Sequence, residues 1–197
     1  MSIITLTGPT CAGKSTIEAQ LQQRGFGRAI SHTTRSPRAG EVSGQHYHFV
    51  SDDEFTRLDG QGKFVEKIQF GSARYSMSAD AIKTAQAASD NVVIVADPHG
   101  VDQIRNFCRK DGLRFFAIWV DCGEQEQARR WIKRMMSDMV MGKEVVGAYS
   151  ERLAIMLGEE VQWRQNCNYG LYDMFLLDRT RSPQQNAEAV QKVVSSL

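Results

Sequence analysis

The sequence predicts an α/β fold in which a parallel sheet is flanked by helices, and three observations support this. A short apolar and β-branched run at residues 3–6 leads directly into a glycine-rich loop, and a helical pattern follows the loop. Two further apolar runs, at 92–96 and 115–120, are separated by a stretch that reads as a helix from Val101 to about Lys110. Ser51, Ser78 and Ser182 are interpreted as N-caps of three further helices. Strands that alternate with helices are typical of a parallel sheet covered on both faces.

Length and composition favour one domain, or one core domain with an elaborated insertion. The chain has 197 residues, of which 42% are hydrophobic and 24% charged, with a formal net charge of +1. This balance predicts no broad basic surface for nucleic acid or a membrane, so we expect any anion binding to be local. The four cysteines show no CxxC pair, and no signal peptide or long apolar span stands out. We therefore expect a reduced, soluble, cytoplasmic protein.

The stretch GPTCAGKST at 8–16 matches the pattern GxxxxGK[ST] through Gly8, Gly13, Lys14 and Ser15. The buried-strand pattern before it and the helical pattern after it, which stops at Gly25, are the context in which this motif forms a P-loop. The alternative is a chance match within an ordinary strand-to-helix turn.

A P-loop binds phosphate through successive backbone N–H groups at the start of a helix. Lys14 is expected to reach the β- and γ-phosphates of a nucleoside triphosphate, and Ser15 is the candidate ligand for Mg²⁺. Cys11 is interpreted as the filler of a free position. We therefore predict ATP and Mg²⁺ as cofactors, with the cofactor-binding residues Gly8, Cys11, Ala12, Gly13, Lys14, Ser15 and Thr16.

A second cluster, SHTTRSPRAGEVSGQHYHF at 31–49, suggests a second phosphate site. Arg35 and Arg38 flank Pro37, which disfavours a regular helix, and Tyr47 lies in an alternating run that resembles a strand. Two guanidinium groups and a phenol can converge on a dianionic phosphate with bidentate geometry. The alternative is a solvated basic loop.

This run, together with the P-loop, resembles the guanylate kinase family. The resemblance extends in looser form to FVEKIQFGSARYSMS at 64–78, VVIVADPHG at 92–100, ARRWIKR at 128–134 and YDMFLLD at 172–178. It implies a P-loop kinase core, a small mixed α/β acceptor-binding insertion and a helical lid. It also implies the following division: 1–32, 91–123 and 166–197 as the core, 33–90 as the nucleoside monophosphate-binding region, and 124–165 as the lid and adjoining helix.

The resemblance also implies roles for acceptor-binding residues. Arg35, Arg38, Tyr47 and Tyr75 would hold the 5′-phosphate of the acceptor, and Ser31 and Glu66 would bind its base. A carboxylate at Glu66 can accept two parallel hydrogen bonds from adjacent donors such as N1–H and the 2-amino group of guanine. The alternative for Glu66 is an ordinary surface acid on a strand.

The catalytic residues that we expect are Lys14, Asp97, Arg130, Arg134 and Arg152. Arg130 and Arg134 share a helix face, and three cations on a lid could neutralise charge as the γ-phosphoryl group transfers. The alternative is ordinary pairing with Glu126 and other acids on a solvated helix.

Three positions depart from the family pattern. Met77 stands where a hydroxyl would donate to guanine O6, Val95 stands where the family has the first acid of a D-x-D pair, and Asp178 replaces an asparagine. Met77 and Asp97 remain candidate substrate-binding residues. The expected acceptor is GMP or dGMP, with another purine or a modified purine deoxynucleotide left open.

The predicted reaction is transfer of the γ-phosphoryl group of MgATP to a nucleoside monophosphate. Two alternatives remain: a sugar-phosphate kinase similar to ribose 1,5-bisphosphate phosphokinase, and a non-catalytic guanylate kinase-like binding module. The partners that we expect are small nucleotides, with the chain a monomer or homodimer. The prediction requires that Arg35 and Arg38 face Lys14 across one shared cavity.

Overall fold

The computed structural model describes residues 1–37, 40–140, 146–165, 167, 169–177 and 181–196. Its main sheet has five strands in the order β2-β7-β1-β8-β9, and every paired neighbour is parallel. The strands are β1 (Ser2–Thr7), β2 (Gly27–Arg28), β7 (Asn91–Val95), β8 (Arg114–Val120) and β9 (Met174–Leu176).

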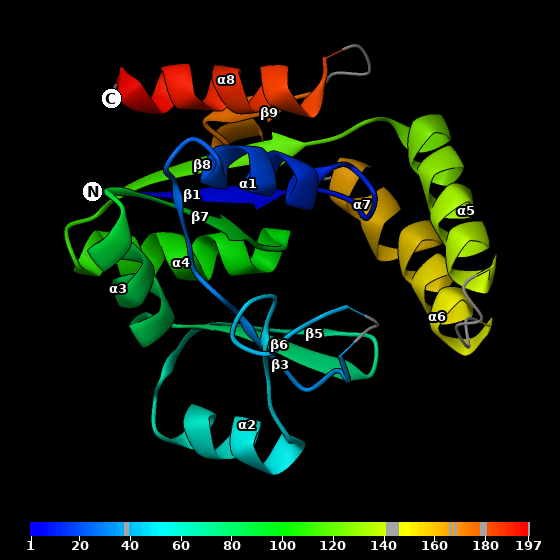
Figure 1. Cartoon of the computed structure of the whole chain (residues 1–197), viewed down its shortest axis with the longest axis horizontal. Helices are drawn as coiled ribbons and strands as arrows, with labels where there is room; N and C mark the ends of the chain where they lie inside the picture. Colours follow the sequence, from blue (N-terminus) through cyan, green and yellow to red (C-terminus); the bar gives the residue numbers. More distant parts are fainter. Residues whose placement is uncertain (38–39, 141–145, 166, 168, 178–180, 197) are drawn as a thin grey trace.

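Helices cover both faces of this sheet (Figure 1). Alternation along β1 sends Ile4 toward one apolar cluster, with Leu21 of α1 and Val190 of α8, and sends Ile3 toward another, with Ile104 of α4. The covering helices are α1 (Lys14–Gln22), α4 (Pro98–Lys110) and α8 (Pro183–Ser195). The predicted α/β fold is therefore confirmed.

A second, four-stranded sheet lies beyond α4 (Figure 1). Its order is β4-β3-β6-β5, with β3 and β4 parallel and the remaining pairs antiparallel. The chain enters this region after β2 and returns to the main sheet through α3. The elements are β3 (His32–Thr33), β4 (His48–Phe49), α2 (Asp52–Gly60), β5 (Phe64–Phe70), β6 (Ala73–Ser78) and α3 (Ala79–Ala88).

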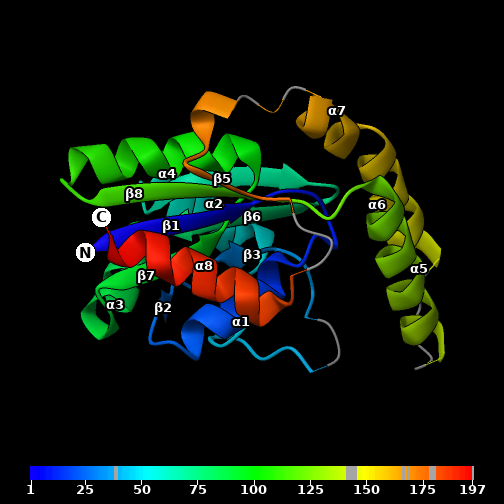
Figure 2. The ribbon, with the colours of Figure 1, turned by 90° about the horizontal axis from the view of Figure 1, so that it is seen from above.

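A helical segment extends from the end of β8 to one side of the main sheet (Figure 2). It consists of α5 (Glu124–Val140), α6 (Val146–Leu157) and α7 (Glu159–Gln165), and a 3₁₀ turn, η1 (Tyr169–Leu171), precedes β9. Arg164 of α7 is anchored to Asp121, just past β8, by two hydrogen bonds of 2.8 and 2.9 Å. Within the described ranges, no helix is long and apolar enough to span a bilayer. The division of the chain into core, acceptor-binding region and lid stays a prediction.

Helix starts were predictable from their caps. Ser51, Ser78 and Ser182 each accept a hydrogen bond from a backbone N–H of the first helical turn. Helix α4, by contrast, begins three residues before the expected Val101, because Asp97 acts as N-cap and Pro98 occupies the first helical position. This shift places Asp97 at the junction of β7 and α4.

Candidate functional site

The P-loop has the backbone geometry that its glycines predict. Gly8 and Gly13 have φ values of 142° and 105°, a region that L side chains rarely adopt. At Gly8 a Cβ atom would lie 1.9 Å from the carbonyl oxygen of Val120, so β8 closes directly against the loop. Cys11 also adopts a positive φ, 61°, although it carries a side chain. The loop is thus shaped both by its own conformation and by the end of β8.

Lys14 folds back over the loop. Its Nζ donates to the carbonyl oxygens of Gly8 and Pro9 at 2.6 and 2.8 Å. On one side of Lys14 is a cavity of about 420 Å³ beside the start of α1. This donor-side cavity is lined by Cys11, Ala12, Gly13, Lys14, Ser15, Thr16, Ile17, Arg130, Arg134, Arg181, Pro183 and Asn186.

Arg130 reaches the loop from α5. Arg130 Nη1 lies 3.4 Å and 3.3 Å from the carbonyl oxygens of Cys11 and Ala12, and Arg130 Nε donates to Glu126 at 2.7 Å. Arg130 therefore forms an ordinary helix-surface pair with Glu126 and contacts the P-loop at the same time. Arg134 also lines the donor-side cavity. The side chain of Arg152 lies outside what the structure describes.

A second cavity, of about 170 Å³, lies between the P-loop and the second sheet. Lys14 lines this acceptor-side cavity as well as the donor-side one. Arg35 also lines it, so the structure places Arg35 and Lys14 on one shared cavity. Its lining is Gly8, Thr10, Lys14, Ser31, Arg35, Tyr47, Glu66, Ile68, Tyr75, Val95, Ala96, Asp97, Glu160 and Trp163.

Arg35 is surrounded by groups that orient its guanidinium. Its Nη1 and Nη2 donate to the two carboxylate oxygens of Glu41 at 2.8 and 3.0 Å, and its Nε donates to the Tyr75 hydroxyl at 3.3 Å. Its Cζ lies 5.4 Å from the centre of the Tyr47 ring. The fork therefore binds a carboxylate in the geometry that a phosphate would use. Arg38 lies outside the described residues.

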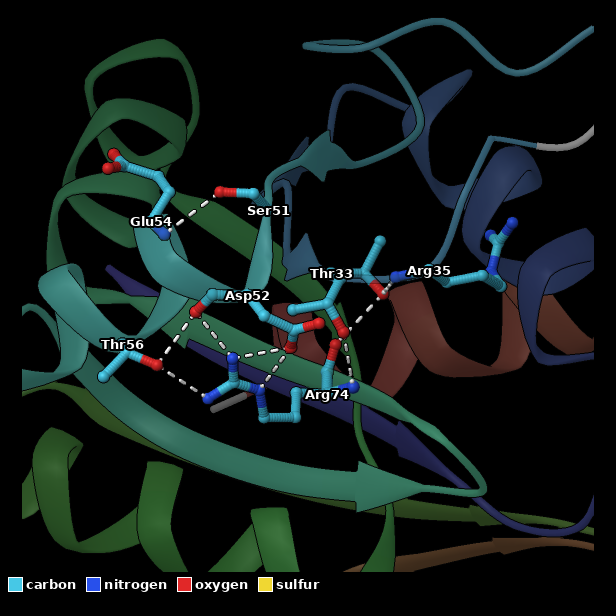
Figure 3. Close-up of polar contacts among 8 residues, drawn as sticks. Thr33, Arg35, Ser51, Asp52, Glu54, Thr56 and Arg74 are labelled. Carbon is cyan, nitrogen blue, oxygen red and sulfur yellow. Dashed lines mark hydrogen bonds and ion pairs between the residues drawn. The ribbon is translucent and has the colours of Figure 1, made fainter.

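The side chain of Arg74, the neighbour of Tyr75, makes its contacts with α2 and not with the acceptor-side cavity. Its guanidinium bonds to Asp52 and to the Thr56 hydroxyl, whereas the Arg35 side chain extends away from this group (Figure 3). Alternation along β6 separates the faces to which Arg74 and Tyr75 point. Arg74 therefore holds α2 onto the sheet.

Glu66 is buried, with 6% of its surface exposed, and it packs against the first turn of α4. A Cβ atom at Gly100 would lie 2.6 Å from Glu66 Oε1, so a side chain at position 100 would displace this carboxylate. Burial, and then the nearby charge of Asp97, raises the pKa of Glu66 to about 8. Burial also raises the pKa of Asp97, whose Oδ1 accepts a hydrogen bond from the Gly100 N–H at 2.6 Å.

The remaining predicted acceptor residues are divided between cavity and core. Ser31, Tyr47 and Tyr75 line the acceptor-side cavity, and so does Val95. Met77 is only 1% exposed and packs in the apolar cluster that includes Ile94 and Val101, while its backbone pairs with Glu66 in the sheet. Asp178 lies outside the described residues.

Sequence reasoning missed Glu160, a buried acid of α7 on the acceptor-side cavity. Its two carboxylate oxygens accept hydrogen bonds from the Thr10 N–H of the P-loop, at 2.8 Å, and from Gln127 Nε2 of α5, at 2.6 Å. An acid on a helix rich in charged residues reads as solvent-exposed, so no local pattern could have singled it out. Arg181 and Asn186, which line the donor-side cavity, were also missed, because neither belongs to a phosphate-binding motif.

The residues present fit a magnesium ion carried by phosphates rather than one held by an acidic cage. Ser15 lines the donor-side cavity beside Lys14. In the described part of the chain, no three His, Cys, Asp or Glu side chains cluster as metal ligands. Mg²⁺ commonly keeps several waters and takes one or two protein ligands together with substrate phosphates. A hydroxyl on a phosphate-binding loop is such a ligand.

Comparison with known proteins agrees with this geometry. The family model described as guanylate kinase matches residues 1–150. The chain is 39% identical over 105 residues to a guanylate kinase of Schizosaccharomyces pombe and 38% identical over 105 residues to that of Homo sapiens. These matches cover 52% of this chain in both cases and 52% and 53% of the relatives, so the chain spans about half the length of the curated relatives it matches.

Among solved structures, a guanylate kinase from Anaplasma phagocytophilum superposes with a TM-score of 0.68 at 19% identity. The superposition covers 99% of this chain and 85% of that one. At this identity the likeness supports the fold, including the segments beyond residue 150.

Proposed function

We propose that this chain, which belongs to the guanylate kinase family, transfers the γ-phosphoryl group of ATP to a guanine nucleoside monophosphate, giving ADP and the diphosphate. The observation that carries the proposal is the position of Lys14 between two cavities. One cavity is lined by the P-loop, and the other by Arg35, Tyr47 and Tyr75. A phosphate bound in each cavity would meet its counterpart at Lys14.

The acceptor phosphate is proposed to bind the Arg35 fork. It would replace the Glu41 carboxylate, which now accepts two hydrogen bonds from that fork. Tyr75, whose hydroxyl accepts a hydrogen bond from Arg35, and Tyr47 would complete the contacts. Because phosphate oxygen is already nucleophilic, no strong base is required, and the chain contributes positioning and charge neutralisation.

The base of the acceptor is proposed to bind Glu66, with Ser31 and Asp97 beside it. The ionised carboxylate can accept from both N1–H and the 2-amino group of guanine. With Met77 buried in the core rather than on the cavity wall, readout of O6 by that side chain is not part of the proposal. A modified purine deoxynucleotide therefore remains within the substrate class.

The donor is proposed to lie along the P-loop and α1. Lys14 would contact the β- and γ-phosphates, and Arg130 and Arg134 would offset the charge of the transferring group. Bound Mg²⁺ would neutralise charge on the phosphates, with Ser15 as its protein ligand.

The test is a substrate panel with the purified chain and MgATP: GMP, dGMP, AMP and ribose 1,5-bisphosphate. We expect GMP or dGMP to give the highest kcat/KM, by about 10² or more over AMP, because adenine carries neither the N1–H nor the 2-amino donor that Glu66 is proposed to bind. Turnover only with the sugar phosphate would favour the sugar-phosphate kinase. Absence of ATP binding by calorimetry would favour a non-catalytic module.

The pH dependence of acceptor binding follows from the raised pKa of Glu66. Two donors on guanine require the ionised carboxylate, so binding must expel the proton that Glu66 holds below about pH 8. We expect the acceptor KM to fall as pH rises from 6 to about 8 and then to level off, by up to about tenfold per unit. The Glu66→Gln variant should bind more weakly and lose this dependence, although titration of the acceptor's own phosphate persists in it.

The same raised pKa sets the sign of the stability change in the free protein. The folded state holds the Glu66 proton more tightly than the unfolded chain does. The contribution of this proton to the free energy of unfolding is therefore present below the unfolded pKa and is lost as pH rises toward about 8. Thermal denaturation without nucleotide should show that Glu66→Gln flattens this part of the profile. An unchanged profile in the variant would contradict the assignment.

A further inference from the structure

Arg28, at the end of the edge strand β2, connects two regions that are far apart in the sequence. Its Nη1 donates to the carbonyl oxygen of Gln45 at 2.8 Å, and its Nη2 donates to that of His46 at 3.1 Å. Its Nε lies 3.3 Å from Glu18 Oε1, in α1. One guanidinium thus contacts both the helix that follows the P-loop and the segment that carries Tyr47.

Glu18 anchors this connection from the core side. Its side chain is 8% exposed, although it lies on a helix with abundant solvent-facing positions. Burial raises the pKa of Glu18 and the charge of Arg28 opposes that rise. Since an unpaired buried carboxylate would be strongly disfavoured, the position of Glu18 is explained by Arg28. Lysine could not replace this planar fork, which donates to two carbonyl oxygens while its Nε faces the Glu18 carboxylate.

The contacted turn is closed by its own hydrogen bonds. The Val42 N–H donates to His46 Nδ1 at 3.0 Å, and the Gly44 N–H donates to the Tyr47 carbonyl oxygen at 2.9 Å. Holding the carbonyls of residues 45 and 46 therefore holds Tyr47, the next residue. The Tyr47 ring lines the acceptor-side cavity, with its centre 6.0 Å from that of Tyr75.

We propose that Arg28, held by Glu18, is a positioning residue that fixes Tyr47 in the acceptor site relative to the helix that follows the P-loop. The inference rests on the proposed function, because it assigns Tyr47 to the acceptor phosphate. Arg28 itself touches neither cavity's phosphate site; it acts through the turn at 42–47. The contacts of Arg28 thus connect α1, beside the donor-side cavity, with Tyr47 in the acceptor-side cavity, and they do not involve Lys14.

The test compares Arg28→Met, which retains the apolar stem, with Arg24→Met. Arg24 also lies beside α1 but pairs with Glu188 near the surface, which makes it a matched control. We expect Arg28→Met to raise the acceptor KM about tenfold, as loss of two charge-assisted hydrogen bonds implies, with kcat and the donor KM within about twofold. Arg24→Met should change none of these.

A double-mutant cycle separates positioning from general structural damage. In a Tyr47→Phe background, Arg28→Met should raise the acceptor KM by less than about twofold, because the group that it positions is already lost. Additive effects, or equal rises in donor and acceptor KM, would overturn the proposal. Glu18→Gln should raise the acceptor KM alone, and by less than Arg28→Met does; this result would support the proposal.

Amide hydrogen exchange makes the result independent of turnover. Arg28→Met should speed exchange at Gly44 and His48 while leaving β1 and β7 protected, and Arg24→Met should not. If the wild-type chain neither binds nor phosphorylates GMP, the proposed function fails. In that case the role of Arg28 in holding the turn is judged by exchange alone: it is contradicted if Arg28→Met leaves exchange at 44–48 unchanged.

Discussion

Replacing Gly8 with alanine is expected to reduce turnover by about 10² or more, and to weaken ATP binding with it. The new Cβ atom would lie 1.9 Å from the Val120 carbonyl oxygen, at a φ of 142°. Neither β8 nor the loop can yield without moving the backbone amides that are proposed to bind phosphate. Calorimetry with ATP, turnover and thermal denaturation would measure the three consequences.

Gly25→Ala is the matched control for Gly8→Ala. Gly25 also has a positive φ, 86°, but no heavy atom lies within 4 Å of the position that an added Cβ would take. The substitution should cost about 1 kcal/mol of stability from backbone strain alone, with ATP affinity unchanged. ATP affinity in Gly8→Ala within about twofold of wild type would contradict the assigned role of the contact with Val120.

Gly100→Ala is expected to raise the acceptor KM by about 10², with the donor KM unchanged, because a misplacement of about 1 Å has effects of that size. The added methyl group would lie 2.6 Å from Oε1 and 2.9 Å from Cγ of Glu66, so the carboxylate must move. Alanine in a helix is otherwise favoured over glycine by about 0.5–1 kcal/mol. Acceptor affinity should therefore fall in Gly100→Ala, whereas helix propensity favours the alanine.

Two comparisons isolate that effect. Gly60→Ala, at a helical glycine with no heavy atom within 4 Å of an added Cβ, should leave both KM values unchanged. In a Glu66→Ala background, Gly100→Ala should have no further effect on acceptor binding. Independent losses from Gly100→Ala and Glu66→Ala would show that Gly100 acts elsewhere.

Local patterns accounted for much of the fold. The serine caps at residues 51, 78 and 182 were readable because a cap is satisfied within one helical turn. The edge strand β2 could not be predicted from the sequence, because its two residues, Gly27 and Arg28, are too few to show a periodicity. Pairing with β7 orders them. The start of α4 was misplaced because Asp97 was interpreted only as a site residue, although its side chain also caps that helix.

The candidate site divides in the same way. Lys14 and Arg35 were identifiable because their motifs are contiguous, and a contiguous loop has a limited range of backbone geometries. Glu160, Gly100 and the Glu18–Arg28 pair were not identifiable, because each acquires its role from a partner in another element of the fold. No local pattern encodes a contact of that kind.

By itself, then, the sequence determined that a phosphate-binding loop joins a buried strand to a helix and that an arginine-bearing segment follows. Short-range hydrogen bonds and dihedral preferences are sufficient for both. The tertiary structure alone decided that Arg35 and Lys14 face one cavity, that Glu66 is buried against Gly100 with a raised pKa, and that Arg28 bridges α1 to the turn before β4. These properties depend on desolvation and on close packing between distant segments.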